Sequence, residues 1–277
     1  MRVERVLVTG GKGKTGRRIA SRLRAAGIDV AIGTRTPDGP RDRRFDWADP
    51  SSALAFDGCD AVYLVAPTDR TDHLAVMQPL LEEAMGRGVR RFVLLSSSLL
   101  EPGGPMMGEV HAWLAKSAPE WAVLRPSWFM QNFSEGPHAP TIREEGTIYS
   151  ATGTGRVGFI DAEDIAATAA ACLIARTLLN SDVVLTGPEA LSYDDAATII
   201  TAALGRPIRH VSLDPAALAA RFLAQGLPSD YANTLIGMDA QIAAGAEDCP
   251  TPGVEQMTGQ RPTSFRAFAN RVLEKWK

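Results

Sequence analysis

The sequence is poor in the residues that build disulfides and metal sites. Its 277 residues contain three cysteines (Cys59, Cys172 and Cys249) and four histidines. The cysteines are odd in number and far apart, none belongs to a Cys-x-x-Cys pair, and the histidines show no metal-ligand spacing. These absences exclude a disulfide framework and are typical of a reducing compartment. We expect no bound metal.

Long apolar runs and an excess of one charge are also absent. The longest apolar stretch, residues 165–175, is too short to span a bilayer. A strand-like run already begins near Val6, which leaves no room for a signal peptide. The net charge of −3, from 29 basic and 32 acidic residues, favours neither nucleic acid nor an anionic membrane as a partner. We expect a cytoplasmic protein with a small-molecule partner, and the sequence leaves its oligomeric state open.

The N-terminal half alternates short apolar runs with segments of helical period. This alternation predicts βαβ units and a parallel sheet that helices cover on both faces, the doubly wound Rossmann arrangement of the α/β class. One predicted helix, residues 71–87, contains Pro79, where we expect a kink or a break. The predicted strands are residues 5–9, 29–33, 61–66, 91–96 and 121–125, with a weaker one at 43–45.

The C-terminal part is mostly helical. The capping-box pattern Ser192–Asp195 and the N-cap pair Asp214-Pro215 each open a predicted helix. Short strands at 183–185 and 208–211 either extend the main sheet or form a small one. The predicted domains are a Rossmann domain over residues 1–130 and a smaller, interleaved substrate-side lobe over residues 131–277.

A glycine-rich turn follows the first predicted strand and opens an amphipathic helix. In a dinucleotide-binding turn, Gly10 supplies the tight bend, Gly13 lets the backbone approach a pyrophosphate, and Gly16 permits close packing of helix on strand. The helix start offers free amides to the anion. The candidate cofactor residues in this turn are Gly10, Lys12, Gly13, Lys14, Thr15 and Gly16.

Two other interpretations of the turn compete. Gly13-Lys14-Thr15 imitates the end of a nucleoside-triphosphate loop, but that motif needs a glycine where Val8 stands. A glycine turn without a ligand is the second. Strand, spacing and helix agree with one another, so we favour the cofactor.

The end of the second predicted strand bears on NAD against NADP. An NAD-binding fold places an acid there, about 20 residues beyond the glycines, whereas an arginine suits a 2′-phosphate. The sequence reads Gly33-Thr34-Arg35-Thr36, so Arg35 is the candidate for NADP(H). Asp38 lies close by in the sequence, so NAD remains an alternative cofactor. Arg35 can also be an ordinary surface arginine in a loop, with no role in cofactor binding.

Several further motifs accompany the glycine turn. They are Phe45-Asp46-Trp47, Tyr63-Leu64-Val65-Ala66-Pro67, Val93-Leu94-Leu95-Ser96-Ser97-Ser98, Leu124-Arg125-Pro126-Ser127-Trp128-Phe129-Met130-Gln131-Asn132-Phe133 and Thr186-Gly187-Pro188-Glu189-Ala190-Leu191-Ser192-Tyr193. With them the chain resembles, over nearly its whole length, the NmrA-like branch of atypical short-chain dehydrogenases. The resemblance is closest to ergot-alkaloid reductases of the festuclavine/agroclavine type and their bacterial relatives.

The resemblance implies roles for residues outside the glycine turn. Asp46 and Trp47 are expected beside the adenine, and Ala66 and Pro67 beside the cofactor. Ser96 is expected to face the nicotinamide. The residues implied on the substrate side are Trp128, Phe129 and Asn132.

The acid that ketone-reducing short-chain dehydrogenases use is missing. Their Tyr-x-x-x-Lys motif would place a tyrosine four residues before Lys116, where Ala112 stands. Reduction of C=O creates an oxyanion that must be protonated, whereas hydride addition to C=N⁺ gives a neutral amine directly. We expect an NADPH-dependent reductase of a cyclic imine or iminium, the class on which the ergot-type reductases act.

Two alternatives remain. His111 can serve as the acid of a C=O or C=C reductase, although a lone helical histidine is more often structural. NmrA-like proteins also include dinucleotide-binding redox sensors that turn nothing over, and a lost Tyr-x-x-x-Lys motif fits that function equally well.

Overall fold

The computed structural model describes residues 2–177 and 180–277. The chain forms two compact units. Unit 1 comprises residues 1–126, 162–184 and 256–259, and unit 2 comprises residues 127–161, 185–255 and 260–277.

Unit 1 is built on a seven-stranded sheet with the order β3-β2-β1-β4-β5-β6-β9. The pairings of β1 with β2 and β4, of β2 with β3, and of β5 with β4 and β6 are all parallel. The chain passes from β1 to β2 on one side and returns to β4 on the other, which is the Rossmann strand order. The predicted fold class is therefore confirmed. The strands are β1 (Arg5–Thr9), β2 (Asp29–Thr34), β3 (Asp42–Arg44), β4 (Ala61–Leu64), β5 (Arg91–Leu95), β6 (Glu120–Pro126) and β9 (Ser181–Leu185).

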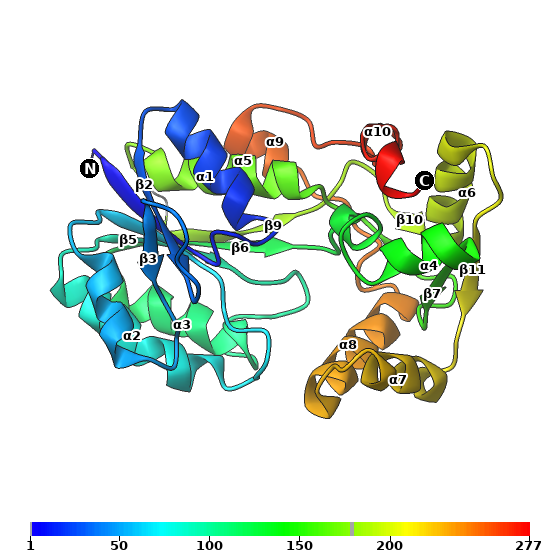
Figure 1. Cartoon of the computed structure of the whole chain (residues 1–277), viewed down its shortest axis with the longest axis horizontal. Coiled ribbons are helices and arrows are strands. Elements are labelled where there is room, and N and C mark those ends of the chain that lie inside the picture. Colours follow the sequence, from blue (N-terminus) through cyan, green and yellow to red (C-terminus); the bar gives the residue numbers. More distant parts are fainter. Residues whose placement is uncertain (1, 178–179) are drawn as a thin grey trace. The chain divides into compact units, whose positions relative to one another are not determined.

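Helices cover both faces of this sheet. Figure 1 shows α1 (Gly16–Ala25) and α5 (Ala162–Ile174) on one face, and α2 (His73–Gly86) and α3 (Met107–Ser117) on the other. Because both faces are covered, the central strands are buried along their length and show no polar alternation. The short helix η1 (Pro50–Phe56) packs beside α2.

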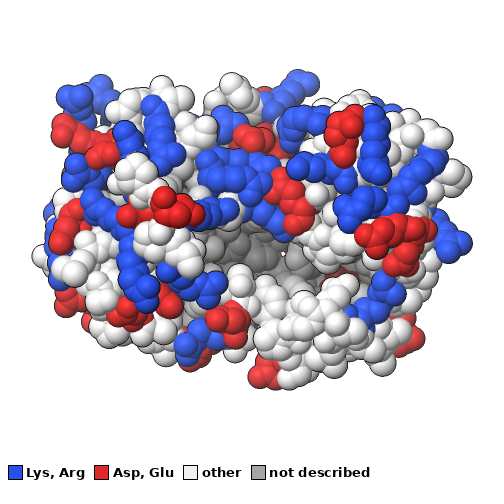
Figure 2. Space-filling model, viewed as in Figure 1, with Lys and Arg blue, Asp and Glu red and all other residues white. Residues whose placement is uncertain are grey.

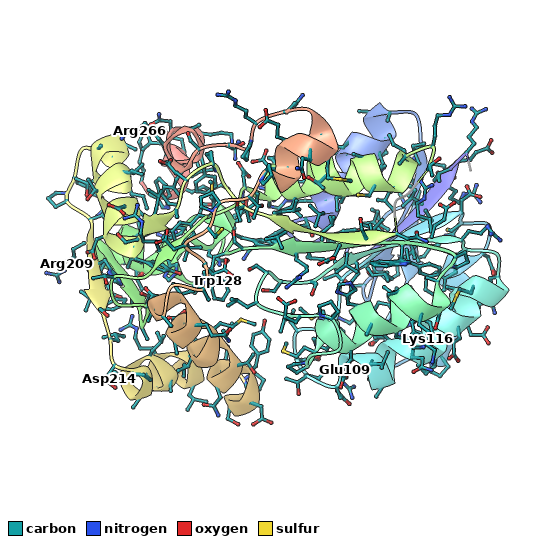
Figure 3. The ribbon with its side chains drawn as sticks, turned by 180° about the vertical axis from the view of Figure 1, so that it is seen from behind. Glu109, Lys116, Trp128, Arg209, Asp214 and Arg266 are labelled. Atoms are coloured by element: carbon teal, nitrogen blue, oxygen red, sulfur yellow. The ribbon has the colours of Figure 1, made fainter. Side chains whose placement is uncertain are left out.

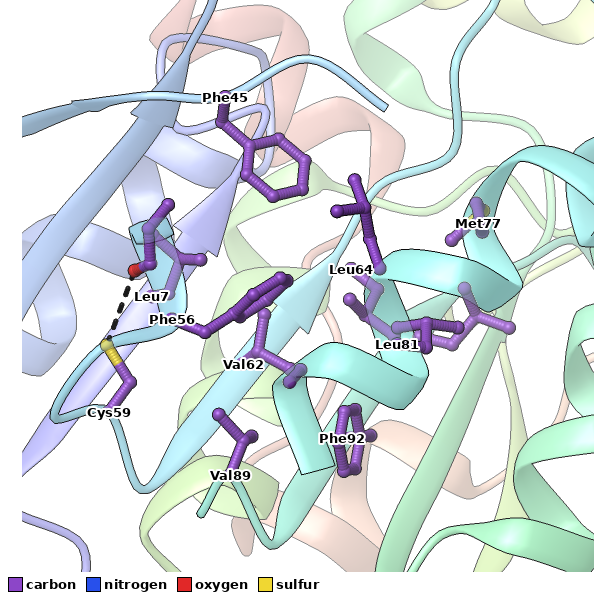
Figure 4. Packing of buried hydrophobic residues seen from close by; sticks show 14 of the residues in the cluster. Leu7, Phe45, Phe56, Cys59, Val62, Leu64, Met77, Leu81, Val89 and Phe92 are labelled. Atoms are coloured by element: carbon purple, nitrogen blue, oxygen red, sulfur yellow. Dashed lines mark hydrogen bonds between the residues drawn. The ribbon is translucent and has the colours of Figure 1, made fainter. Parts of the chain in front are cut away.

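The core of unit 1 on the α2 side is apolar and aromatic. Figure 4 shows side chains of β1, β4 and β5 meeting those of η1 and α2. Among them, Phe56, Val62, Leu81 and Phe92 are fully buried. This packing fixes the strand ends from which the candidate site is built.

Of the kink or break expected at Pro79, the break is contradicted, because α2 continues through the proline. The helix runs continuously from His73 to Gly86. Pro79 and Ala75, whose carbonyl loses its helical donor, are both exposed. Water can satisfy that carbonyl, so the cost of the proline is small enough for the surrounding packing to hold the helix together.

Unit 2 has its own aromatic core. Phe133 packs edge-to-face on Phe159 and Phe265, with ring centroids 5.2 Å and 5.0 Å apart. The indole of Trp276, near the C-terminus, donates to the Phe133 carbonyl at 2.6 Å. The elements are η2 (Met130–Asn132), α4 (His138–Glu145), β7 (Thr147–Ser150), β8 (Arg156–Val157), β10 (Leu191–Ser192), α6 (Tyr193–Leu204), β11 (Arg209–Ser212), α7 (Pro215–Ala224), α8 (Ser229–Ala243), α10 (Phe265–Arg271) and η3 (Leu273–Lys275). Helix α9 (Gly253–Thr258) contributes residues to both units.

The predicted helix starts in unit 2 are confirmed. The Ser192 hydroxyl accepts from the Asp195 amide, and Asp195 accepts from the Ser192 amide, which makes a complete capping box for α6. Asp214 accepts from the Ala217 amide at the start of α7. Both short predicted strands form. Strand β9 belongs to the main sheet, and β11 pairs in parallel with β7 in a separate two-stranded sheet.

The surface carries both charges. Basic and acidic side chains are interspersed on the face shown in Figure 2. Within residues 2–177 and 180–277, no helix combines the length and the apolar character needed to cross a membrane.

Candidate cofactor and substrate sites

The glycine turn lies where the strand order of the sheet reverses. It leaves β1 at Thr9, and Gly10 bends the chain with a φ of +59°, a left-handed conformation that glycine adopts without strain. Helix α1 begins at Gly16, where an added Cβ would lie 2.7 Å from the Cα of Gly11. The Tyr63 hydroxyl of β4 donates to Thr15 Oγ1 at 3.1 Å and holds the helix start against the sheet. The turn and the start of α1 therefore lie at the carboxyl end of β1, next to β4, where such folds bind ligands.

A cavity of about 570 Å³ opens beside this turn. It is bounded by the ends of β1, β2 and β4 and by the segment after β3. Seven of the residues expected to hold the cofactor line it: Gly10, Gly13, Arg35, Asp46, Trp47, Ala66 and Pro67. The other lining residues were not anticipated: Thr34, Phe45, Ala48, Val65, Thr68, Asp69, Arg70 and Val76.

The Lys12 ammonium forms ion pairs with two aspartates rather than lining the cavity. Its Nζ lies 2.8 Å from Asp38 Oδ1 and 3.1 Å from Asp42 Oδ2, and it donates to the Thr36 carbonyl at 2.8 Å. The amides of Asp38 and Gly39, together with this ammonium, hold the pKa of the Asp42 carboxyl at about 2. Lys12 thus ties the glycine turn to the loop after β2.

The ion pair between Lys12 and Asp38 distinguishes Asp38 from Arg35, the two residues that bear on the choice between NAD and NADP. Asp38, which left NAD open, is occupied by Lys12. Arg35 is exposed, lines the cavity, and has no ion-pair partner among the described residues. A free guanidinium at this strand end suits an anionic group such as a 2′-phosphate.

Trp47 forms a fixed wall of the cavity. It is 9% exposed, packs edge-to-face on Phe45, and its Nε1 donates to the Val65 carbonyl at 2.9 Å. The side chain of the neighbouring Asp46 forms a hydrogen bond within its own loop, where its Oδ1 accepts from the Ala48 amide at 3.0 Å. The segment after β3 is therefore rigid and tied to the end of β4.

Ser96 comes directly after β5 and carries an unusual hydroxyl. Its Oγ is buried and has no hydrogen-bond partner in the described part of the chain, while its amide donates to the Leu124 carbonyl at 2.8 Å. A buried hydroxyl without a partner is costly unless a ligand completes it. Together with the glycine turn and the cavity, it fits a nicotinamide cofactor. Of the expected cofactor residues, Lys12, Lys14, Thr15, Gly16 and Ser96 are not among the residues that line the cavity.

His111 lies on the buried face of α3. It is 2% exposed, and its ring centroid is 5.6 Å from that of Trp121. Burial lowers its pKa, against smaller opposing effects of Asp182 and Glu101. The structure does not place His111 among the residues that line the cavity.

The three residues expected on the substrate side all belong to unit 2. Trp128, labelled in Figure 3, is half-buried, and its Nε1 is buried without a hydrogen-bond partner among the described residues. Phe129 forms an isolated parallel bridge with Ile160, and the Asn132 amide donates to the Phe129 carbonyl at 3.0 Å. The structure thus brings these residues onto one short turn.

Arg70, like its neighbour Asp69, is a charged residue of the cavity lining that the sequence did not predict. Its guanidinium forms two hydrogen bonds with Asp72, each of 2.5 Å. The available signal was its position six residues beyond Leu64, the last residue of β4, in a loop at the carboxyl edge of a parallel sheet.

Known proteins agree with this geometry. The NAD(P)H-binding family model matches residues 10–176, from the glycine turn to the end of α5. An uncharacterised oxidoreductase of Bacillus subtilis is 42% identical over 100% of this chain and 98% of its own. The agroclavine dehydrogenase of Claviceps fusiformis is 41% identical, and the festuclavine dehydrogenase of Aspergillus fumigatus is 38% identical, each over 98% of both chains.

Solved structures show the same fold at lower identity. An NADPH-dependent quinone oxidoreductase from Escherichia coli, complexed with NADPH, superposes with a TM-score of 0.80 at 20% identity, over 97% of this chain and 99% of that one. The family model spans the glycine turn, and the full-length relatives are named dehydrogenases or an oxidoreductase. The chain therefore belongs to the NAD(P)H-binding family, in the group of the agroclavine and festuclavine dehydrogenases and their bacterial relatives, and is an NAD(P)H-dependent oxidoreductase.

Proposed function

We propose that the protein is an NADPH-dependent reductase that transfers hydride to the C=N bond of a cyclic imine or iminium. The observation that carries the proposal is the surface of α3, where a ketone reductase of this class needs a tyrosine. Ala112 stands four residues before Lys116, and both are exposed; Figure 3 labels Lys116 on this helix. Neither side chain can donate a proton to an alkoxide in a closed site.

The chemistry of an iminium removes the need for such a donor. NADPH, when bound, supplies the hydride. Addition to a C=N⁺ carbon moves the electron pair onto nitrogen and leaves a neutral amine, so no oxyanion forms. The protein then has to orient the two reactants and exclude water, and positioning carries the catalysis. The names of the clavine dehydrogenase relatives support a basic, nitrogen-containing substrate.

Arg35 supports NADPH over NADH. In this proposal its free guanidinium binds the 2′-phosphate, while Lys12 withdraws Asp38 from the ribose. Asp46, Trp47, Ala66 and Pro67 hold the adenosine half of the cofactor, and the unpartnered hydroxyl of Ser96 binds at the nicotinamide. Lys14, Thr15 and Gly16 act with the amides of α1 on the pyrophosphate.

His111 is not favoured as an acid. Burial lowers its pKa, so the imidazole is neutral near neutral pH and is a poor proton donor. Its contact with Trp121 is that of a core residue. A C=O or C=C reductase that depends on His111 therefore ranks below the iminium reductase.

The proposed substrate side is the turn that carries Trp128, Phe129 and Asn132. Aromatic faces hold organic cations well, and the unpartnered Trp128 indole N–H offers one hydrogen bond. Both features suit a planar, cationic heterocycle.

A substrate comparison tests the function. We expect NADPH consumption with N-methyldihydroisoquinolinium and none with the ketone of the same ring size, tetralone. Turnover should persist in His111→Gln. Reduction of the ketone alone, with a rate that falls as an acid deprotonates, would contradict the proposal. Binding of NADPH without turnover of either compound would favour the redox-sensor alternative.

A further inference from the structure

Asp239 is a buried carboxylate that no cation neutralises. It lies on α8, is 8% exposed, and its Oδ2 accepts from the Ala151 amide at 2.8 Å. That is its one hydrogen bond with the described residues, and no described lysine, arginine or histidine forms an ion pair with it. The second carboxylate oxygen has no hydrogen-bond partner among residues 2–177 and 180–277.

Unit 2 contains a second side-chain oxygen without a described hydrogen-bond partner, the hydroxyl of Tyr193. Tyr193, the first residue of α6, is 4% exposed, and no described residue hydrogen-bonds to its hydroxyl. Burial raises the pKa of Tyr193, and the charge of Asp239 raises it further. The Tyr193 ring packs against Phe159 at 5.3 Å and Phe133 at 5.7 Å between centroids. Two histidine rings also pack on Tyr193, His210 at 5.5 Å and His138 at 5.6 Å between centroids, so the phenol lies among aromatic and titratable side chains.

Another buried carboxylate of the same unit, Asp161, is neutralised by a cation. Asp161 is fully buried, and it pairs with the guanidinium of Arg271 and accepts from Gln131 Nε2 at 2.8 Å. Asp239 lacks such a partner, and burial raises its pKa to about 6. It is still mostly ionised at neutral pH, which costs folding free energy. An asparagine would accept the Ala151 amide equally well, so the charge itself has no structural use.

We propose that Asp239 is the anchor for the cationic nitrogen of the substrate, with the hydroxyl of Tyr193 beside it as a polar contact. This inference rests on the proposed function, because it names the charged group by which unit 2 selects the same substrate. The missing counter-ion of Asp239 is then the ligand. Hydride addition discharges the nitrogen, so the carboxylate binds the starting cation more tightly than the transition state and acts on KM rather than kcat.

Binding of a cation that cannot be reduced tests the anchor separately from catalysis. The probe is N,N-dimethyltetrahydroisoquinolinium, whose charge is permanent, titrated calorimetrically into the NADPH-loaded protein. Asp239→Asn removes the charge and keeps the shape. Asp230→Asn, in the exposed first turn of the same helix, is the matched control.

We expect Asp239→Asn to weaken binding of the cation by about tenfold or more, and Asp230→Asn to leave it unchanged. Wild-type affinity should fall as the pH drops through about 6, where Asp239 gains its proton, and the Asp239→Asn variant should show no such dependence. For N-methyldihydroisoquinolinium, KM should rise with kcat unchanged or higher. A loss of kcat at unchanged KM would overturn the anchor.

The outcomes separate the two proposals. Equal affinity of wild type and Asp239→Asn, or no binding of the cation although the iminium is reduced, overturns the anchor and leaves the reductase standing. Asp239-dependent binding without any reduction supports the anchor and contradicts the reductase. An unchanged NADPH affinity and a melting temperature no lower than wild type show that the variant is folded.

Discussion

The indole of Trp47 donates a hydrogen bond to the carbonyl of Val65 at 2.9 Å and so fastens the wall of the cofactor cavity to the end of β4. Trp47→Phe keeps an aromatic ring but leaves that carbonyl without its donor. We expect a loss of about 1 kcal/mol in unfolding free energy and a few-fold weaker NADPH binding. Thermal melting and calorimetric titration measure both, and unchanged values would show that the bond does not shape the cavity.

Gly16 tests the close approach of α1 to the glycine turn. Gly16→Ala places a Cβ 2.7 Å from Gly11 Cα, so the turn must shift. We expect a destabilisation of about 1–3 kcal/mol and a large loss of NADPH affinity. Gly86→Ala is the control, because a Cβ there meets nothing within 4 Å. That variant should be neutral or slightly stabilised, and equal effects in both variants would contradict the packing role of Gly16.

Arg35 tests the choice between the two cofactors. We expect Arg35→Ala to weaken NADPH binding by about 10- to 100-fold and to leave NADH binding nearly unchanged, since the 2′-phosphate alone loses its partner. Arg41→Ala, an exposed arginine outside the lining of the cavity, is the control. Titrations by tryptophan fluorescence quenching measure six affinities, those of the wild type and of the two variants for NADPH and for NADH. Equal binding of NADPH and NADH by the wild type would make Arg35 an ordinary surface residue.

Asp239 also predicts a pH dependence of stability. Its pKa rises from 3.8 to about 6 in the folded protein, so the folded state holds the proton more tightly than the unfolded state. The contribution of this group to stability is therefore lost as the pH rises from about 4 to about 6. Asp239→Asn should be more stable than wild type at pH 7, by about 1–3 kcal/mol, and the difference should vanish below about pH 4. Urea unfolding at both pH values measures it; a less stable variant at pH 7 would show that the charge has a partner in the folded protein.

His111 predicts a variant with normal chemistry. Because its imidazole is buried and its pKa is lowered, His111→Gln should change kcat for an iminium by less than about twofold and leave the pH profile intact. The cost should appear instead in stability, at about 1 kcal/mol. A kcat reduced about 100-fold, with loss of one limb of the pH profile, would restore His111 as the acid.

Local patterns predicted the first half of the fold well. Strand β1 spans residues 5–9 as expected, and the glycine turn and α1 follow it because glycine spacing and helical period are properties of short segments. The break expected at Pro79 did not occur, because solvent exposure on that helix face depends on the tertiary fold. Strand β7 was not anticipated: it has four residues, and its partner β11 lies about sixty residues further along the chain.

The residues of the candidate site also fall into those that local sequence patterns predict and those that only the tertiary fold reveals. Arg35 and Trp47 were recognisable because each stands at a strand end or in a motif. The pairing of Lys12 with Asp38 was not, since it depends on how the loop after β2 folds back on the glycine turn. The sequence could not single out Asp239 either. An aspartate in a helical segment of mixed composition is ordinary until the tertiary fold shows that it is buried and has no cation beside it among the described residues.

The most direct test of the central claim is transfer of deuterium from NADPH labelled at the reactive C4 position to a permanently charged cyclic iminium, followed by mass spectrometry of the amine. We expect an amine with one deuterium on the former iminium carbon, at a rate that does not depend on a protein acid. Oxidation of the labelled NADPH without deuterium in the amine, or no reaction with the iminium while a ketone is reduced, would contradict it.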